Sequence, residues 1–251
     1  MTPFAHSVLE VADAQYEDPR LARIYDPLDP DRSDLDAYSA LVDECGAGSV
    51  LDVGCGTGTW ACLLAQRGLV VVGLDPAAAS LEVARTKPGA DRVRWVHGDS
   101  TALPPLQVDL ATMTGNVAQV FVTDADWMVT LRAIGEALRP GGRLVFESRV
   151  PEDQAWCRWT PRESHTRAVV KGVGLVDSWV EVVDVQGPLV SFRSTFAFES
   201  DGVVLTSEST LKFRTREELA DSLSEAAFRV EEIRDAPDRP GREFVFIAYR
   251  P

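Results

Sequence analysis

Short apolar runs alternate with amphipathic segments over the first three-fifths of the chain. Apolar residues recur at helical spacing up to Cys45, which predicts a helix that begins at Ser33 or Asp34. Beyond it, the pattern predicts strands at 49–53, 69–74, 93–96, 108–113 and 143–148, separated by helices at 59–66, 76–86 and 125–138. Apolar strands that alternate with helices predict a parallel sheet that is covered on both faces.

The pattern changes after Ser148. Four strand-like runs follow without helices between them, at 168–173, 175–185, 189–199 and 203–213. Apolar and polar residues alternate from Val190 to Phe198, which is typical of a sheet with one buried face. A helix over 215–226, with Thr215 and Glu218 as its capping box, and strands at 228–234 and 243–249 then return the chain to the first sheet.

The predicted fold class is therefore α/β, with a seven-stranded, mostly parallel sheet between helices and an inserted antiparallel β-sheet. Residues 1–149 are expected to form an amino-terminal lid segment and most of the core. Residues 150–213 are expected to form the inserted sheet, and residues 214–251 to complete the core.

The charge of the chain narrows the classes of partner. It has 25 Lys and Arg residues against 39 Asp and Glu residues, for a net charge of −14. An acidic surface repels the phosphate backbone, so we expect no nucleic acid as partner.

Cysteine and histidine usage predicts no metal site. The four cysteines have no C-x-x-C spacing, only three histidines are present, and reduced thiols in a core are expected. No basic stretch leads into an apolar one at Met1-Thr2-Pro3-Phe4, which predicts no signal peptide. Apolar stretches end well before about 20 residues, so we expect no membrane partner and a cytoplasmic protein.

A glycine-rich loop follows the strand at 49–53. Glycines at Gly54, Gly56 and Gly58 let the backbone turn sharply and approach a ligand closely, and the helix that follows favours an anionic group. Asp75 ends the next strand, where a carboxylate can accept two hydrogen bonds from a ribose diol. These features suit both NAD and S-adenosylmethionine (SAM).

Glycine spacing distinguishes the two ligands. The dinucleotide fingerprint G-x-G-x-x-G requires a glycine where this chain has Thr59. The spacing favours SAM, and an NAD-dependent oxidoreductase remains the alternative.

The ordered motifs resemble those of class I SAM-dependent methyltransferases. The segment Val50–Gly58 is similar to the first motif of that family, and Val71–Asp75 to the second. Gly98-Asp99-Ser100 resembles the motif that caps the adenine, and Leu138–Leu144 the segment before the fifth strand. The resemblance covers about residues 45–150, and it implies a Rossmann-like sheet and a reaction that yields S-adenosylhomocysteine (SAH).

The resemblance also implies which positions bind the cofactor. Expected cofactor-binding residues are Tyr25, Asp52, Gly54, Gly56, Thr57, Asp75, Pro76, Asp99, Ser100 and Thr114. The glycines and Thr57 are expected around the methionine part, Asp75 on the ribose and Asp99 on the adenine amino group. Tyr25 is expected to close over SAM from a segment ahead of the first helix, with Arg32 as a further candidate for that lid.

The sequence leaves the catalytic residues open. Methyl transfer is an in-line displacement in which positioning supplies much of the rate, and a base is needed only where the acceptor must lose a proton. Asn116 and Gln119 are candidates to orient an acceptor, or a helix-capping Asn and a loop Gln. His165 is a candidate base or a surface residue.

The expected activity is methyl transfer from SAM to a small-molecule acceptor. The inserted sheet is expected to cap the acceptor or to form a homodimer interface. A non-catalytic SAM-binding partner subunit is the further alternative.

Overall fold

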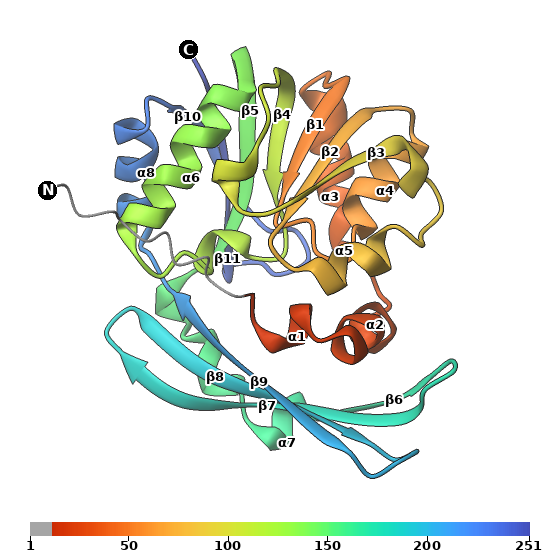
Figure 1. The fold of residues 1–251 in the computed structure, drawn as a ribbon. Coiled ribbons are helices and arrows are strands. Elements are labelled where there is room, and N and C mark those ends of the chain that lie inside the picture. Colours follow the sequence, from red (N-terminus) through yellow and green to blue (C-terminus); the bar gives the residue numbers. More distant parts are fainter. Residues whose placement is uncertain (1–11) are drawn as a thin grey trace, which may run out of the picture.

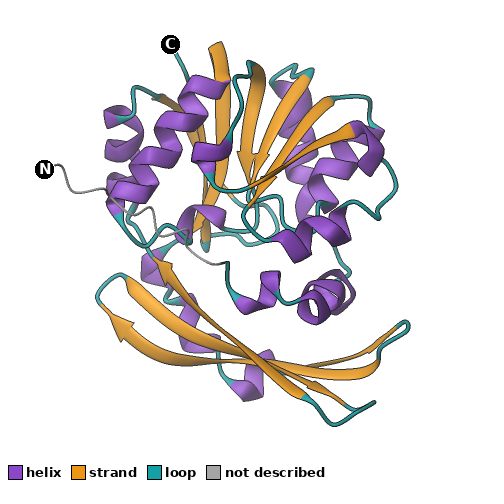
Figure 2. Cartoon of the chain, viewed as in Figure 1, coloured by secondary structure: helices purple, strands orange, loops and turns teal. Residues whose placement is uncertain are grey.

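In the computed structural model, which describes residues 12–251, two β-sheets face each other with two short helices between them (Figure 1). The amino-terminal segment on which the absence of a signal peptide was predicted lies outside the described residues. Helices flank the larger sheet. The smaller sheet lies below it, with one face toward the two short helices between the sheets (Figure 2).

The larger sheet has seven strands in the order β10-β11-β5-β4-β1-β2-β3. Neighbouring pairs are parallel, except that β11 runs antiparallel to both β5 and β10. The strands are β1 (Ser49–Val53), β2 (Val70–Asp75), β3 (Val93–His97), β4 (Val108–Met113), β5 (Leu138–Arg149), β10 (Arg229–Asp235) and β11 (Glu243–Tyr249). This sheet confirms the predicted α/β class.

Helices cover both faces of this sheet because successive strand residues point to opposite sides. Leu51 packs into a cluster with Trp127 and Leu219, and the adjacent Val50 packs on the other face with Leu35 and Trp60. The helices involved are α3 (Asp34–Glu44), α4 (Thr59–Gln66), α5 (Ala78–Ala84), α6 (Asp124–Ala137) and α8 (Arg216–Glu225). Within residues 12–251, no helix combines the length and apolarity needed to cross a membrane.

The second sheet is antiparallel, in the order β6-β7-β8-β9. Its strands are β6 (Thr166–Val170), β7 (Gly174–Gln186), β8 (Leu189–Phe198) and β9 (Val204–Lys212), and α7 (Pro161–Ser164) precedes them. The inserted sheet is thus confirmed, whereas dimerisation through it stays a prediction.

Two helices that the sequence pattern did not predict lie between the sheets. They are α1 (Ala14–Glu17) and α2 (Pro19–Leu28), so the prediction that Tyr25 precedes the first helix is wrong. Asp18 accepts hydrogen bonds from the backbone N–H of Arg20 and Leu21 and thereby caps α2, which buries Leu21 and Ile24 against the four-stranded sheet. The predicted cap at Ser33 makes no side-chain bond at the start of α3.

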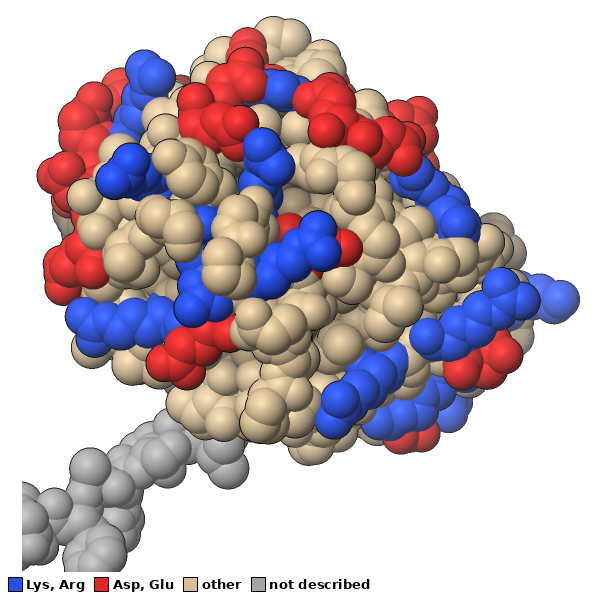
Figure 3. Space-filling view, turned by 90° about the horizontal axis from the view of Figure 1, so that it is seen from above, with Lys and Arg blue, Asp and Glu red and all other residues tan. Residues whose placement is uncertain are grey.

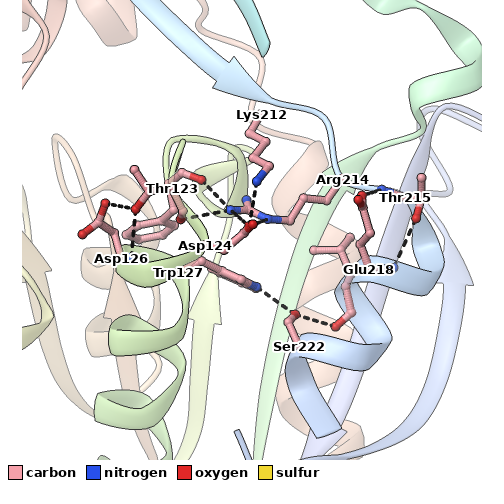
Figure 4. A network of polar contacts seen from close by, with 11 residues as sticks. Thr123, Asp124, Asp126, Trp127, Lys212, Arg214, Thr215, Glu218 and Ser222 are labelled. Atoms are coloured by element: carbon pink, nitrogen blue, oxygen red, sulfur yellow. Dashed lines mark hydrogen bonds and ion pairs between the residues drawn. The ribbon is translucent and has the colours of Figure 1, made fainter. Parts of the chain in front are cut away.

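A buried arginine joins the two sheets where β9 leads into α8. The Arg214 guanidinium is almost fully buried and donates hydrogen bonds to the carbonyl oxygens of Phe121 and Thr123 and to the Asp124 carboxylate (Figure 4). Lys212 also pairs with Asp124, at 2.7 Å. These contacts fix the end of the four-stranded sheet on the start of α6. The predicted capping box of Thr215 and Glu218 is formed beside them.

The end of the molecule that lies farthest from the four-stranded sheet carries charges of both signs. Viewed from the side of the seven-stranded sheet away from the four-stranded one, Lys and Arg side chains are interspersed with Asp and Glu (Figure 3). The glycine-rich loop lies at the other end, where β1, β2 and β4 finish opposite the four-stranded sheet (Figure 1).

Candidate active site

A cavity of about 590 Å³ lies where the carboxyl ends of β1, β2 and β4 face the four-stranded sheet. One wall consists of the glycine-rich loop and the residues that follow β2 and β4. The opposite wall consists of α1 and residues from β7, β8 and β9. Ligands of open α/β sheets bind at this carboxyl edge, so the cavity is the candidate site.

The three loop glycines adopt left-handed backbone conformations, with φ of 69° at Gly54, 52° at Gly56 and 74° at Gly58. A Cβ atom at Gly54 would stand 2.6 Å from Val117, and one at Gly58 would stand 2.5 Å from Trp95. A Cβ atom at Gly56 would meet nothing within 4 Å. Gly54 and Gly58 are therefore needed for packing, whereas Gly56 leaves backbone exposed to the cavity.

Asp75 links the end of β2 to this loop. Its carboxylate accepts a hydrogen bond from the backbone N–H of Gly56 at 2.7 Å and another from that of Ala77 at 2.8 Å. Burial raises the pKa of Asp75, and the two backbone hydrogen bonds oppose that rise. Each oxygen keeps acceptor capacity, and the residue lines the cavity, so it can receive a ribose diol.

Thr57 connects the loop to α2. Its hydroxyl donates to Asp26 at 2.7 Å, and Lys87 forms an ion pair with Asp26 at 2.6 Å. Tyr25, the residue before Asp26, lines the cavity from α2. The structure thus brings Tyr25 and Thr57 together in the lining of the cavity, and a contact of either residue with SAM stays a prediction.

Arg32 is the single Lys or Arg side chain among the described residues that line the cavity. It pairs with Asp34 at 3.2 Å and lies close enough to Asp52 to lower the pKa of that carboxyl. The positive charge therefore lies at the glycine-loop end, where it can receive an anionic group.

Asp52 lies behind the loop and outside the cavity lining. One of its oxygens accepts a hydrogen bond from Thr112 at 3.2 Å, and the other has no partner among the described residues. Burial is the main cause that raises the pKa of Asp52, to about 7. A direct contact of this residue with SAM stays a prediction.

The residues expected around the adenine are only partly brought together. Pro76 lines the cavity, whereas Asp99 and Ser100 do not. The Asp99 carboxylate accepts from the backbone N–H and hydroxyl of Thr101, and the buried Ser100 bonds to Thr130 at 3.2 Å.

The loop after β4 contributes Thr114 and Gly115 to the cavity, but Asn116 and Gln119 turn away from it. The backbone N–H of Asn116 donates to Glu147 at 3.0 Å, and its side-chain amide donates to Glu243 at 3.0 Å. Gln119 accepts from Arg149 at 2.9 Å. Both residues are buried and hold the loop in place.

His165 also lies outside the cavity lining. Its Nε2 atom is 2.9 Å from Asp177, and the side chain is exposed on the segment that leads into β6. The three residues considered as catalytic candidates therefore do not meet in this structure.

Sequence reasoning missed the wall opposite the glycine loop. Asp13 and Tyr16 line the cavity from the start of α1, and Phe192 and Ser209 line it from β8 and β9. The polar run 206–210 within a predicted strand was a usable signal, because such a run suits a wetted cavity better than a core.

Comparison with known proteins finds sequence similarity to methyltransferases. Residues 50–142 match the model of a methyltransferase domain. An uncharacterized methyltransferase of Mycobacterium tuberculosis is 33% identical over 111 residues, which is 43% of this chain and 55% of that protein. The chain thus spans about half the length of the curated relatives that it matches.

Solved structures share the fold over most of their length. An S-adenosylmethionine-dependent methyltransferase from Clostridium acetobutylicum aligns with a TM-score of 0.71 at 18% identity, over 92% of this chain and 98% of that one. The amino pentose methyltransferase CalS10 of Micromonospora echinaspora, solved with SAM bound, aligns with a TM-score of 0.66 at 22% identity, over 88% and 93%. These likenesses establish the architecture around the cavity.

Proposed function

We propose, from the premise that this chain has the class I SAM-dependent methyltransferase fold and carries a methyltransferase domain over residues 50–142, that it transfers a methyl group from SAM to a small-molecule acceptor and yields SAH. The observation that carries the proposal is the cavity bordered by the glycine loop and by Asp75. Because the curated relatives are matched over only part of their length, the activity of the whole chain is part of the proposal.

The glycine-loop wall fits SAM residue by residue. Asp75 would bind the ribose hydroxyls, and the exposed backbone of Gly56 would lie against the methionine part. The carboxylate of SAM would face Arg32, the cation at this end of the cavity. Tyr25 would cover the ligand from α2.

SAM supplies a methyl group whose carbon–sulfur bond breaks as the bond to the acceptor forms, with the bonding electron pair left on sulfur. The chain contributes binding and orientation, and its cavity wall shields the reacting groups from bulk water. Thr114 and Gly115 line the cavity from the loop after β4.

A small acceptor is supported by the size and charge of the site. The cavity volume of about 590 Å³ lies in the range for small-molecule sites, and it would hold both SAM and a compact acceptor. The neighbour described as an amino pentose methyltransferase supports an acceptor of similar size. The net charge of −14 disfavours polyanionic acceptors.

The test is calorimetric titration with SAH, SAM and NADH. We expect one SAH per chain with micromolar affinity, and no binding of NADH. Asp75→Ala is expected to weaken SAH by about 10- to 100-fold, because two charge-assisted hydrogen bonds to the ribose are lost.

Three other results would contradict the proposal. Absence of heat and of a thermal shift with SAH removes it, and preferential binding of NADH restores the oxidoreductase alternative. SAM binding with no SAH produced over a broad panel of metabolites supports the non-catalytic subunit instead.

A further inference from the structure

We propose that the acceptor presents an amine, and that Asp13 binds this amine in its ammonium form on the wall opposite the glycine loop. The inference rests on the proposed methyl transfer and names the class of acceptor for the same cavity.

Under the proposed function, the glycine-loop wall of the cavity would bind SAM and the opposite wall would bind the acceptor. Glycine-loop residues and Asp75 occupy the wall expected to bind SAM. The lining that faces them comes from α1 and the residues before it, and from β7, β8 and β9, so an acceptor that lies beside SAM would contact these elements. An acceptor class can therefore be inferred from their side chains.

Charge is distributed unequally between the walls. Arg32 is placed at the end that faces the carboxylate of SAM, and no described Lys or Arg lines the opposite wall. Asp13 and Glu208 supply carboxylates to that wall. Glu208 is exposed and paired with Arg193 at 2.6 Å, which leaves Asp13 as the uncompensated charge.

Asp13 is held in place with one oxygen left over. Its Oδ2 atom accepts a hydrogen bond from Ser209 of β9, and its Oδ1 atom accepts none from the described residues. The side chain is half-buried, and burial raises the pKa of Asp13 while the Ser209 hydrogen bond lowers it. An ammonium group would supply the missing donor, and a charge-assisted hydrogen bond is about twice as strong as a neutral one.

Hydrogen bonds attach α1 to β9 on one side and to α5 on the other. The backbone N–H of Gln15 donates to Ser207 of β9 at 2.9 Å, and the hydroxyl of Ser80 of α5 donates to the carbonyl of Tyr16 at 2.9 Å. Asp13 is therefore presented from a fixed backbone, as a binding residue requires.

The surrounding surface suits the body of an organic amine. Val183 and Phe192 line the cavity from this wall, the ring of Tyr16 adds an aromatic face, and Val120 and Val122 line the cavity from the segment after β4. A cation that lies over an aromatic ring is attracted by the negative face of that ring. We infer an acceptor with an apolar ring or chain beside its amine.

The same wall disfavours other acceptor classes. A carboxylate would be repelled by Asp13. An alcohol would donate a hydrogen bond to Asp13 without the attraction of a positive charge. An amine binds as the ammonium ion and releases one proton to solvent before its nitrogen forms the new bond to carbon.

The experiment uses the full-length protein saturated with SAH and three probes of matched shape: cyclohexylmethylamine, cyclohexylmethanol and cyclohexanecarboxylate. Ligand-observed NMR titration gives the dissociation constant of each probe. We expect the amine to bind about tenfold or more tightly than the alcohol, and the carboxylate not to bind.

Variants assign the preference to Asp13. Asp13→Asn should weaken the amine about tenfold and leave the alcohol unchanged, because Asn keeps an acceptor for Ser209 but loses the charge. Affinity for SAH should stay at its wild-type value, which shows that the variant is folded. Asp221→Asn, the same change on the exposed surface of α8, should alter neither probe.

The outcomes separate the two proposals. Failure of the wild-type protein to bind SAH overturns the proposed function and this inference with it. Normal SAH binding with no preference for the amine, including no binding of any probe up to about 10 mM, overturns the inference alone. An unchanged amine affinity in Asp13→Asn does the same.

Discussion

Gly54 and Gly56 have similar backbone conformations and different surroundings. Both have φ in the left-handed region, at 69° and 52°. An added Cβ would overlap Val117 at the first position and would point into open space at the second. A methyl group at each position therefore separates the packing role of the loop from its role beside the ligand.

We expect Gly56→Ala to abolish measurable SAH binding while it lowers stability by about 1–2 kcal/mol, the cost of a left-handed alanine. Gly54→Ala should lower stability further, because the 2.6 Å overlap with Val117 forces the loop to shift. Urea unfolding and calorimetry measure the two effects.

Gly68→Ala is the matched control for Gly56→Ala. Its φ of 91° is also left-handed, and its Cβ would meet nothing within 4 Å, but it lies on the surface after α4. The variant should lose a similar amount of stability and keep SAH affinity. Equal SAH affinity in Gly56→Ala and the wild type would show that the loop does not approach the ligand.

A second residue-scale prediction concerns the buried carboxyl of Asp52, whose pKa in the folded protein is about 7. The unfolded chain has a pKa of about 3.9 for this group, so between about pH 4 and 7 the folded state binds the extra proton. Stability therefore falls as pH rises through this window, and the contribution is constant above it. Asp52→Asn removes the dependence, so the stability of the wild type relative to the variant should fall by on the order of 2 kcal/mol from pH 5 to pH 8.

Urea unfolding of both proteins at pH 5, 6, 7 and 8 gives this difference directly. Subtracting the variant cancels a buried carboxyl that does not interact with Asp52, such as Glu147, whose pKa burial also raises. Parallel stability curves for the wild type and Asp52→Asn would contradict the assignment.

At the scale of the element, the strands of the seven-stranded sheet and the helices that cover it were predictable, because residues close in the sequence determine each of them. β1, α4 and β4 have the predicted bounds, since apolar runs and the loop glycines define their ends. The predicted start of β5 at residue 143 was wrong: the strand begins at Leu138, and Pro140-Gly141-Gly142 lies in a bulge between the residues that pair with Val108 and Leu110. Pairing with β4 at Val108 and with the carboxyl terminus, not local propensity, extends that strand.

α1 and α2 were missed because their stability comes from distant contacts. Asp18 and Pro19 form a good helix start, but the aspartate- and proline-rich composition obscured it. Ile24 is buried only because the four-stranded sheet, some 150 residues later in the chain, lies against it. The position of Asp13 at the cavity depends on the same long-range packing, so no local motif could reveal it.

The Arg214 cluster makes a prediction at this scale. Arg214→Met should lower the free energy of unfolding by about 2–4 kcal/mol, because the carbonyl oxygens of Phe121 and Thr123 and the Asp124 carboxylate lose their hydrogen-bond donor. Arg216→Met, two residues later on the exposed face of α8, should change it by less than about 0.5 kcal/mol. Equal unfolding midpoints for the two variants in urea would show that the cluster does not stabilise the junction.

At the scale of the whole molecule, the two sheets form one site only through the segment between them. α2 is tied to the glycine loop by Asp26 and Thr57, and α1 is tied to β9 through Asp13 and Ser209. The cavity has lining residues from all of these elements. A ligand that fills the glycine-loop wall should therefore stabilise segments far from it in the sequence.

Hydrogen exchange with and without SAH tests this coupling. At an SAH concentration 100 times its dissociation constant, the bound state gains about 2.7 kcal/mol, so amides that open only when SAH leaves should exchange up to about 100-fold more slowly. We expect this protection in the glycine loop and across Pro19–Leu28 of α2, because Tyr25 and Asp26 connect that helix to the site. The β7–β8 turn at Gly187 and the edge strand β10 serve as internal controls, since neither lines the cavity. Protection confined to residues 49–115 would mean that the amino-terminal helices do not close over the ligand, and that the seven-stranded sheet binds SAH by itself.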